Sequence, residues 1–160
     1  MTTKITLALQ QAIDALSIRD VYLGSSRANV QSGFLVKYQD ISMAEVQQLQ
    51  TPLYSRNYEV SSEGQHLNIA WLLGLRWVER NEDEKEPTVI AQIEAEFIAE
   101  YSVEGELGKE SIDEFAKKNA IYHIWPYWRE FLCSQAERLR LPRPTVATLQ
   151  LSHHRENQDK

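Results

Sequence analysis

The most apolar strand-like segment of the chain reads LNIAWLLGLRWVE, from Leu67 to Glu79. In an extended strand successive side chains point to opposite faces. One face of this segment would carry Ile69, Trp71, Leu73, Leu75 and Trp77, whereas the opposite face is mixed. The pattern predicts a central strand with a fully buried face.

A second alternating segment follows directly. After a charged turn at 80–86, residues 88–103 place apolar side chains at every second position, with glutamines and glutamates between them. Two long strands joined by a short polar loop predict an antiparallel hairpin.

Further strands are expected before this hairpin. Residues 18–30 resemble a strand with a bulge or bend at Gly24, and residues 34–38 look like its continuation. Residues 53–60 alternate between apolar and polar side chains and predict a half-buried strand, followed by a turn at 61–64.

Helices are expected on both sides of the strand block. Residues 4–16 show helical spacing of apolar side chains. A capping-box pair, Ser42 with Glu45, predicts a short helix at 43–50 that Pro52 ends. Residues 109–140 predict two helices. A second capping box, Ser111 with Glu114, begins the first, and Pro126 stands in the first turn of the second.

This order predicts an α+β fold, an antiparallel sheet of about four strands with helices packed on one face. The expected organisation is a single domain over residues 1–151 and a disordered polar tail at 152–160.

Composition excludes several classes of function. The net charge of −6 disfavours nucleic-acid binding, which needs clustered Lys and Arg. The lone Cys133 allows neither an intramolecular disulfide nor a thiolate zinc site, and we expect it to be a buried, inert thiol. No apolar run is long enough for a signal peptide or a membrane span, so we expect a cytoplasmic protein with no membrane insertion.

The sequence shows no catalytic motif, so we expect no enzyme, no cofactor and no metal site. The pair His153-His154 stands in the polar tail. His123 lies beside Trp125, where a packed, hydrogen-bonded histidine is expected rather than a general base. Glu94 and Glu96 are read as the outward face of a strand.

The unusual feature is the excess of large apolar side chains. It fits an ordinary core plus an oligomer interface, and it equally fits an apolar groove for extended peptide. The candidate polypeptide-binding or interface residues are Trp71, Leu73, Trp77, Phe97, Tyr101, Trp125 and Trp128.

The segment from Ala120 to Glu130, with its core Trp125-Pro126-Tyr127-Trp128-Arg129-Glu130 and the later Arg138 and Pro142, resembles the helical region of the SecB family of export chaperones. The strand block stands in family order, and the resemblance covers roughly residues 17–150.

The resemblance implies a SecB-like sheet with helices on one side, assembled as a dimer of dimers. It implies an ATP-independent holdase that binds unfolded or aggregation-prone polypeptide. Export members pass exported precursors to the SecA motor through acidic positions on the sheet.

This chain departs from that pattern in its N-terminal helix, in an insertion at 31–52, and in lacking a long amphipathic helix after Leu151. Ser25, Asn29 and Gln92 stand where export members carry acids, so no motor-contact residues are carried over and binding to SecA stays open. These differences resemble SecB-like chaperones of toxin–antitoxin systems, whose client is an antitoxin. The alternative is a small-molecule-binding α+β domain or an enzyme without a recognisable motif.

Overall fold

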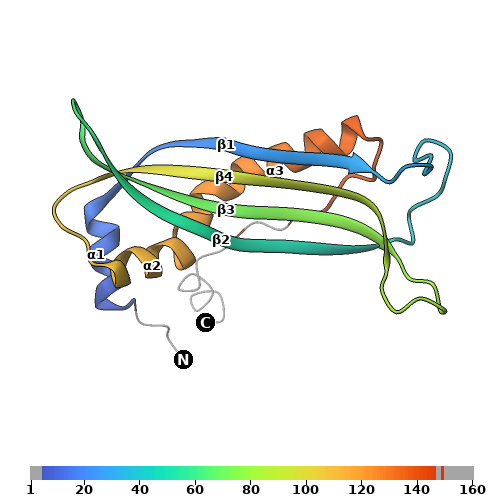
Figure 1. The fold of residues 1–160 in the computed structure, drawn as a ribbon, viewed down its shortest axis with the longest axis horizontal. Helices are drawn as coiled ribbons and strands as arrows, with labels where there is room; N and C mark the ends of the chain where they lie inside the picture. Colours follow the sequence, from blue (N-terminus) through green and yellow to red (C-terminus); the bar gives the residue numbers. More distant parts are fainter. Residues whose placement is uncertain (1–4, 147–148, 150–160) are drawn as a thin grey trace, which may run out of the picture.

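A computed structural model describes residues 5–146 and residue 149 of the chain. Its elements, in order, are α1 (Leu7–Ala15), β1 (Leu16–Val30), β2 (Glu45–Val60), β3 (Gly64–Glu79), β4 (Thr88–Val103), α2 (Lys109–Lys118) and α3 (Ala120–Arg138). Figure 1 shows α3 lying across one face of the sheet, with α1 and α2 together at one end. The expected α+β architecture is confirmed.

The four strands form one antiparallel sheet in the order β1-β4-β3-β2. The predicted hairpin of β3 and β4 is its centre, with Trp71 opposite Phe97 and Leu73 opposite Ala95. The connection from β1 to β2 therefore crosses from one edge of the sheet to the other. Both edge strands are long, at 15 and 16 residues.

The core lies between the sheet and α3. Alternate residues of β3 and β4 supply its sheet side, and α3 supplies one stripe of its own side chains. That stripe contains Trp125, Trp128, Leu132 and Ala136. Burying a large apolar side chain contributes roughly 1.5–3 kcal/mol, so these alternating faces dominate the stability of the fold.

The predicted helix at 43–50 is wrong, because β2 begins within this segment, at Glu45. Residues 45–50 all pair with β3; Gln48, for example, lies opposite Leu75. Ladder hydrogen bonds and cross-strand packing outweigh the local capping signal of Ser42 and Glu45. Pro52 is tolerated inside the strand because β2 is an edge, and the register shifts between Pro52 and Tyr54.

The predicted strand at 34–38 is also wrong. The chain turns twice here, with Phe34 N donating to Gln31 O at 3.1 Å and Tyr38 N donating to Leu35 O at 2.9 Å. Gly33 has a φ of 83°, which glycine adopts without the steric cost of a side chain. The segment is the crossover between sheet edges, which an extended continuation of β1 could not make.

Two helix-start predictions need correction. Helix α2 begins at Lys109 with Gly108 as a cap that provides no side-chain hydrogen bond, so Ser111 and Glu114 form no capping box. Pro126 does not start a helix but lies inside α3, which begins at Ala120. A single residue, Asn119, separates α2 from α3.

The predicted N-terminal helix is confirmed as α1, where the hydroxyl of Thr6 accepts a hydrogen bond from Leu9 N at 3.2 Å. The strands expected at 18–30, 67–79 and 88–103 are confirmed as β1, β3 and β4.

The polar tail at 152–160 lies outside the described residues. Among the helices described, none combines the length and apolarity that crossing a bilayer needs.

Candidate functional site

All of the apolar residues singled out from the sequence lie in the core. Their exposed fractions are 0% for Leu73 and Tyr101, 2% for Trp77, 3% for Trp128, 4% for Phe97, 5% for Trp125 and 6% for Trp71. The chain's own helices therefore cover them, and the surface open to a partner is made by other residues. Direct contact between these side chains and a polypeptide stays a prediction.

A groove runs between the edge strand β2 and helix α2, which lie beside each other in Figure 1. It consists of two hollows of about 180 and 390 Å³. Both are lined by Ser55 of β2 and Asp113 of α2, so the hollows join at this point. We call this feature the β2–α2 groove; its lining residues are Pro52, Leu53, Tyr54, Ser55, Asn57, Leu107, Lys109, Ile112, Asp113, Ala116 and Lys117.

The two walls of the groove run antiparallel. One hollow joins residues 52–55 to residues 113–117, and the other joins Ser55 and Asn57 to residues 107–113. Moving forward along the strand therefore means moving backward along the helix. The groove is elongated and follows the edge of the sheet for about six residues, roughly 20 Å of extended chain.

The helical wall is held in place from both sides. On the sheet side, Trp71 Nε1 donates a buried hydrogen bond to the carbonyl of Ala116 at 2.9 Å, and Phe115 is buried in the core. On the other side, α1 packs against α2. Thr6 Oγ1 donates to Glu114 Oε2 at 3.2 Å, and Ser111 Oγ donates to Gln11 Oε1 at 3.4 Å.

The strand wall offers backbone groups. Strand β2 pairs only with β3, and no backbone hydrogen bond to its outer edge occurs among the described residues. An open edge of this kind is a template for another extended chain. Beside it, Leu53 is 42% exposed at the register shift and provides an apolar contact point.

A network of polar side chains lies on the sheet face away from α3. Tyr58 Oη donates to Glu100 Oε2 at 2.6 Å, and Asn68 Nδ2 donates to Tyr22 Oη at 3.2 Å. Desolvation, helped by Glu100, raises the pKa of Tyr58 to about 12, so its hydroxyl stays a donor. Tyr54 Oη also donates to Glu96, at 3.3 Å.

The same network borders a buried histidine. His66 Nδ1 lies 3.5 Å from Glu100 Oε1, and His66 Nε2 lies 3.5 Å from Glu63 Oε2. Neither ring nitrogen has a hydrogen-bond partner among the described residues. No set of three metal-ligating side chains is grouped to hold an ion in the part of the chain that the structure describes.

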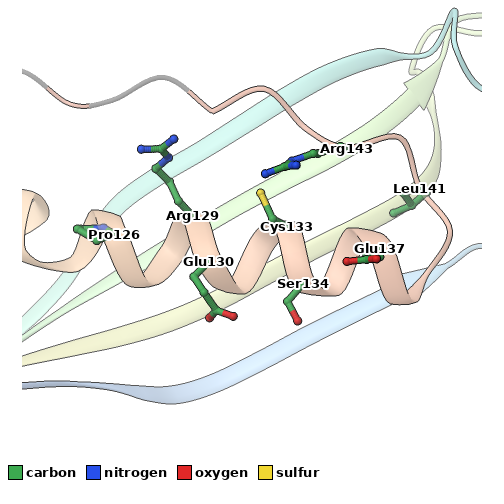
Figure 2. Close-up of a pocket in the computed structure, with 8 residues that line it drawn as sticks. All are labelled: Pro126, Arg129, Glu130, Cys133, Ser134, Glu137, Leu141 and Arg143. Atoms are coloured by element: carbon green, nitrogen blue, oxygen red, sulfur yellow. The ribbon is translucent and has the colours of Figure 1, made fainter.

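A hollow of about 780 Å³ lies along the outer face of α3 (Figure 2). Figure 2 shows Arg129, Cys133 and Arg143 on one side of the helix and Glu130 and Ser134 on the other. Among the described residues, no histidine lines this hollow, so none of them offers Cys133 or Ser134 an imidazole base there. Cys133 is half-buried, which corrects the expectation of a fully buried thiol.

His123 behaves as the sequence led us to expect. A hydrogen bond of 2.9 Å joins its Nδ1 to Tyr101 Oη, and its ring packs near Phe115. Burial lowers the pKa of His123 and raises that of Tyr101. The pair is a packed core contact. His153 and His154 lie outside the described residues.

Sequence reasoning missed the β2–α2 groove. One signal was available: Pro52 within an alternating pattern indicates an edge strand. A second was the stripe of Lys109, Asp113 and Lys117 at helical spacing. Neither signal places the two segments side by side, because more than fifty positions separate them in the chain.

No family model and no curated protein sequence matches the chain. Among solved structures, the chain is similar to the Mycobacterium tuberculosis Rv1957 SecB-like chaperone in complex with a ChAD peptide from the Rv1956 HigA1 antitoxin. The TM-score is 0.70 at 18% identity, and the match covers 91% of this chain and 98% of that one. A protein of unknown function from Streptococcus agalactiae also matches, with a TM-score of 0.39 at 8% identity, over 82% of this chain and 96% of that one. The first match confirms the fold that the resemblance implied: the chain has a SecB-like fold.

Proposed function

We propose that this protein is an ATP-independent chaperone that binds non-native polypeptide in extended form. The observation that carries the proposal is the β2–α2 groove, an open strand edge with a helix beside it. A structural neighbour with the same fold is a SecB-like chaperone bound to an antitoxin peptide, which supports a polypeptide ligand here.

The geometry suggests how a client would bind. An extended segment adds a strand to the outer edge of β2, so its main chain satisfies the backbone groups of that edge. Alternate side chains then enter the groove and contact Leu53, Ile112 and Ala116, while the others face solvent. Main-chain bonding gives affinity for many sequences, as a holdase requires, and lowers the free concentration of the aggregating form.

Two client classes remain within this proposal. Ser25, Asn29 and Gln92 replace the acids expected of an export chaperone, and this favours an antitoxin client over exported precursors handed to SecA. Both classes place the protein in the cytoplasm. Genes for a toxin and an antitoxin beside its own gene would support the dedicated role.

The chaperone is proposed to act as a homo-oligomer, a tetramer built as a dimer of dimers. The other sheet edge supports self-association, since β1 exposes Ile18 by 44%, Tyr22 by 39% and Leu23 by 43%. Closed symmetry would cover these side chains in a self-complementary contact.

A groove-filling substitution tests the proposal. Ser55 lies in both hollows and is exposed, so Ser55→Trp would fill the groove without disturbing the core. Ser62→Trp, in the exposed turn after β2, adds the same side chain elsewhere. Without nucleotide, the wild-type protein and the Ser62 variant should suppress aggregation of chemically reduced insulin, and the Ser55 variant should fail. Equal suppression by both variants would exclude the groove as the client site.

A further inference from the structure

Three charged side chains line the helical wall of the β2–α2 groove. Lys109, Asp113 and Lys117 are four residues apart, which places them in one row along α2. All three are lining residues of the groove, with Asp113 at the junction of the two hollows. The wall therefore presents the order positive, negative, positive along its length.

The spacing of this row matches an extended chain. Four helical residues advance about 6 Å along the axis. Two strand residues advance about 6.8 Å. A strand that runs alongside the helix thus brings every second side chain opposite one charge of the row, and the mismatch over the whole row is only about 1.6 Å.

These charges are available to a ligand. Among the described residues, none of Lys109, Asp113 and Lys117 takes part in an ion pair or side-chain hydrogen bond. The neighbouring Lys118 is different, because its ammonium is bound to Glu114. The pKa of Glu114 is lowered first by that hydrogen bond, with only a minor electrostatic contribution from Lys117.

The β2 side of the groove does not neutralise the row. Its lining residues are Pro52, Leu53, Tyr54, Ser55 and Asn57, none of which carries a charge at neutral pH. Among the described residues that line the groove, the charges therefore come from α2.

We propose that the β2–α2 groove selects extended polypeptide segments with acidic side chains at two positions four residues apart, and no acidic side chain at the position midway between them. The acids lie against Lys109 and Lys117, and the middle residue lies against Asp113. This inference rests on the proposed function, since it specifies which segments the same groove holds.

The test uses the full chain and three fluorescent peptides measured by anisotropy. The peptides share one sequence in which apolar residues alternate with polar ones. They differ only at the two positions four residues apart, which are both Glu, both Gln or both Lys. Exposed ion pairs contribute about 0.2–1 kcal/mol each. Two such pairs predict about 2- to 30-fold tighter binding of the Glu peptide than of the Gln peptide at low salt. The Lys peptide should bind most weakly, and the differences should shrink as salt is added.

A pair of matched variants separates local contact from long-range attraction. The double substitution Lys109→Glu with Lys117→Glu should reverse the preference, so that the Lys peptide binds best. The control, Lys37→Glu with Lys85→Glu, makes the same change in net charge in the two loops at 31–44 and 80–87 and should keep the original preference. Circular dichroism shows whether each variant remains folded.

The outcomes distinguish the two proposals. Equal binding of the Glu and Gln peptides to wild-type protein overturns the charge selectivity while leaving the groove as a client site. Equal effects of the two double variants also overturn it, because net charge alone would then explain the preference. If none of the peptides binds the wild-type chain, the proposed function fails and the selectivity fails with it.

Discussion

Replacing Trp71 by Phe removes one buried hydrogen bond while keeping an aromatic ring in the core. Trp71 Nε1 donates to the carbonyl of Ala116 at 2.9 Å, in the last turn of α2. This bond is a polar link between the sheet and the helical wall of the groove. Without it, the buried Ala116 carbonyl loses its side-chain donor, a change that costs about 1–3 kcal/mol.

Trp77 supplies a matched control. It lies on the same face of β3, is 2% exposed, and its indole makes no hydrogen bond within the described part of the chain. Trp77→Phe therefore has a similar cavity cost, below the about 3–5 kcal/mol of a truncation to Ala, but loses no polar contact. The difference between the two variants isolates the hydrogen bond.

The assay is urea unfolding followed by circular dichroism at one fixed protein concentration, since self-association would otherwise shift the midpoint. Trp71→Phe should lose about 1–3 kcal/mol more than Trp77→Phe, or roughly 2–12 °C in Tm. It should also weaken peptide binding more, and amide exchange in α2 should accelerate. Equal losses of stability in the two variants would refute the claim that this bond fixes the groove wall.

The remaining predictions concern the core, its pH dependence and the β1 edge. Trp128→Ala should cost about 3–5 kcal/mol in urea unfolding, whereas Ala at its exposed neighbour Tyr127 should cost about 0.5 kcal/mol or less. Burial lowers the pKa of His123 in the folded chain. As the pH falls below about 6.5, the imidazole is therefore protonated more readily in the unfolded chain than in the folded one. Stability should therefore fall on acidification through this window, and His123→Gln should flatten the fall; an unchanged profile would contradict this. Leu23→Lys should reduce the mass measured by light scattering, whereas Leu35→Lys in the crossover should not, and retention of the full oligomer by the Leu23 variant would exclude the β1 edge as an interface.

The centre of the sheet was predictable, and one edge was not. Both strands of the β3–β4 hairpin carry large apolar side chains at every second position, and burial on a shared face enforces that pattern. The first half of β2 has no comparable pattern. Gln47, Gln48 and Gln50 are strand residues because β3 offers them a partner, and local capping signals cannot report a partner so distant in sequence.

The apolar residues proposed as binding residues illustrate a second limit. They were chosen because they are large and apolar, and the same property drives a side chain into the core. Hydrophobicity alone does not separate a client-binding residue from a core residue. The β2–α2 groove is instead lined by a mixture of apolar, polar and charged residues, so its signal is the juxtaposition of an unpaired edge and a helix.

Under the proposed function, the two edges of this sheet have different roles. Strand β1 exposes apolar side chains, which suit a permanent contact between copies. Strand β2 carries Gln47, Gln48 and Gln50 before the groove, but it also exposes Val46 by 47% and Leu49 by 39%, so its outer segment is mixed. What distinguishes this edge from β1 is the groove beside it. Since α2 presents its three groove charges in a fixed order, the proposed selectivity would make binding depend on the side chains of a client as well as on its backbone.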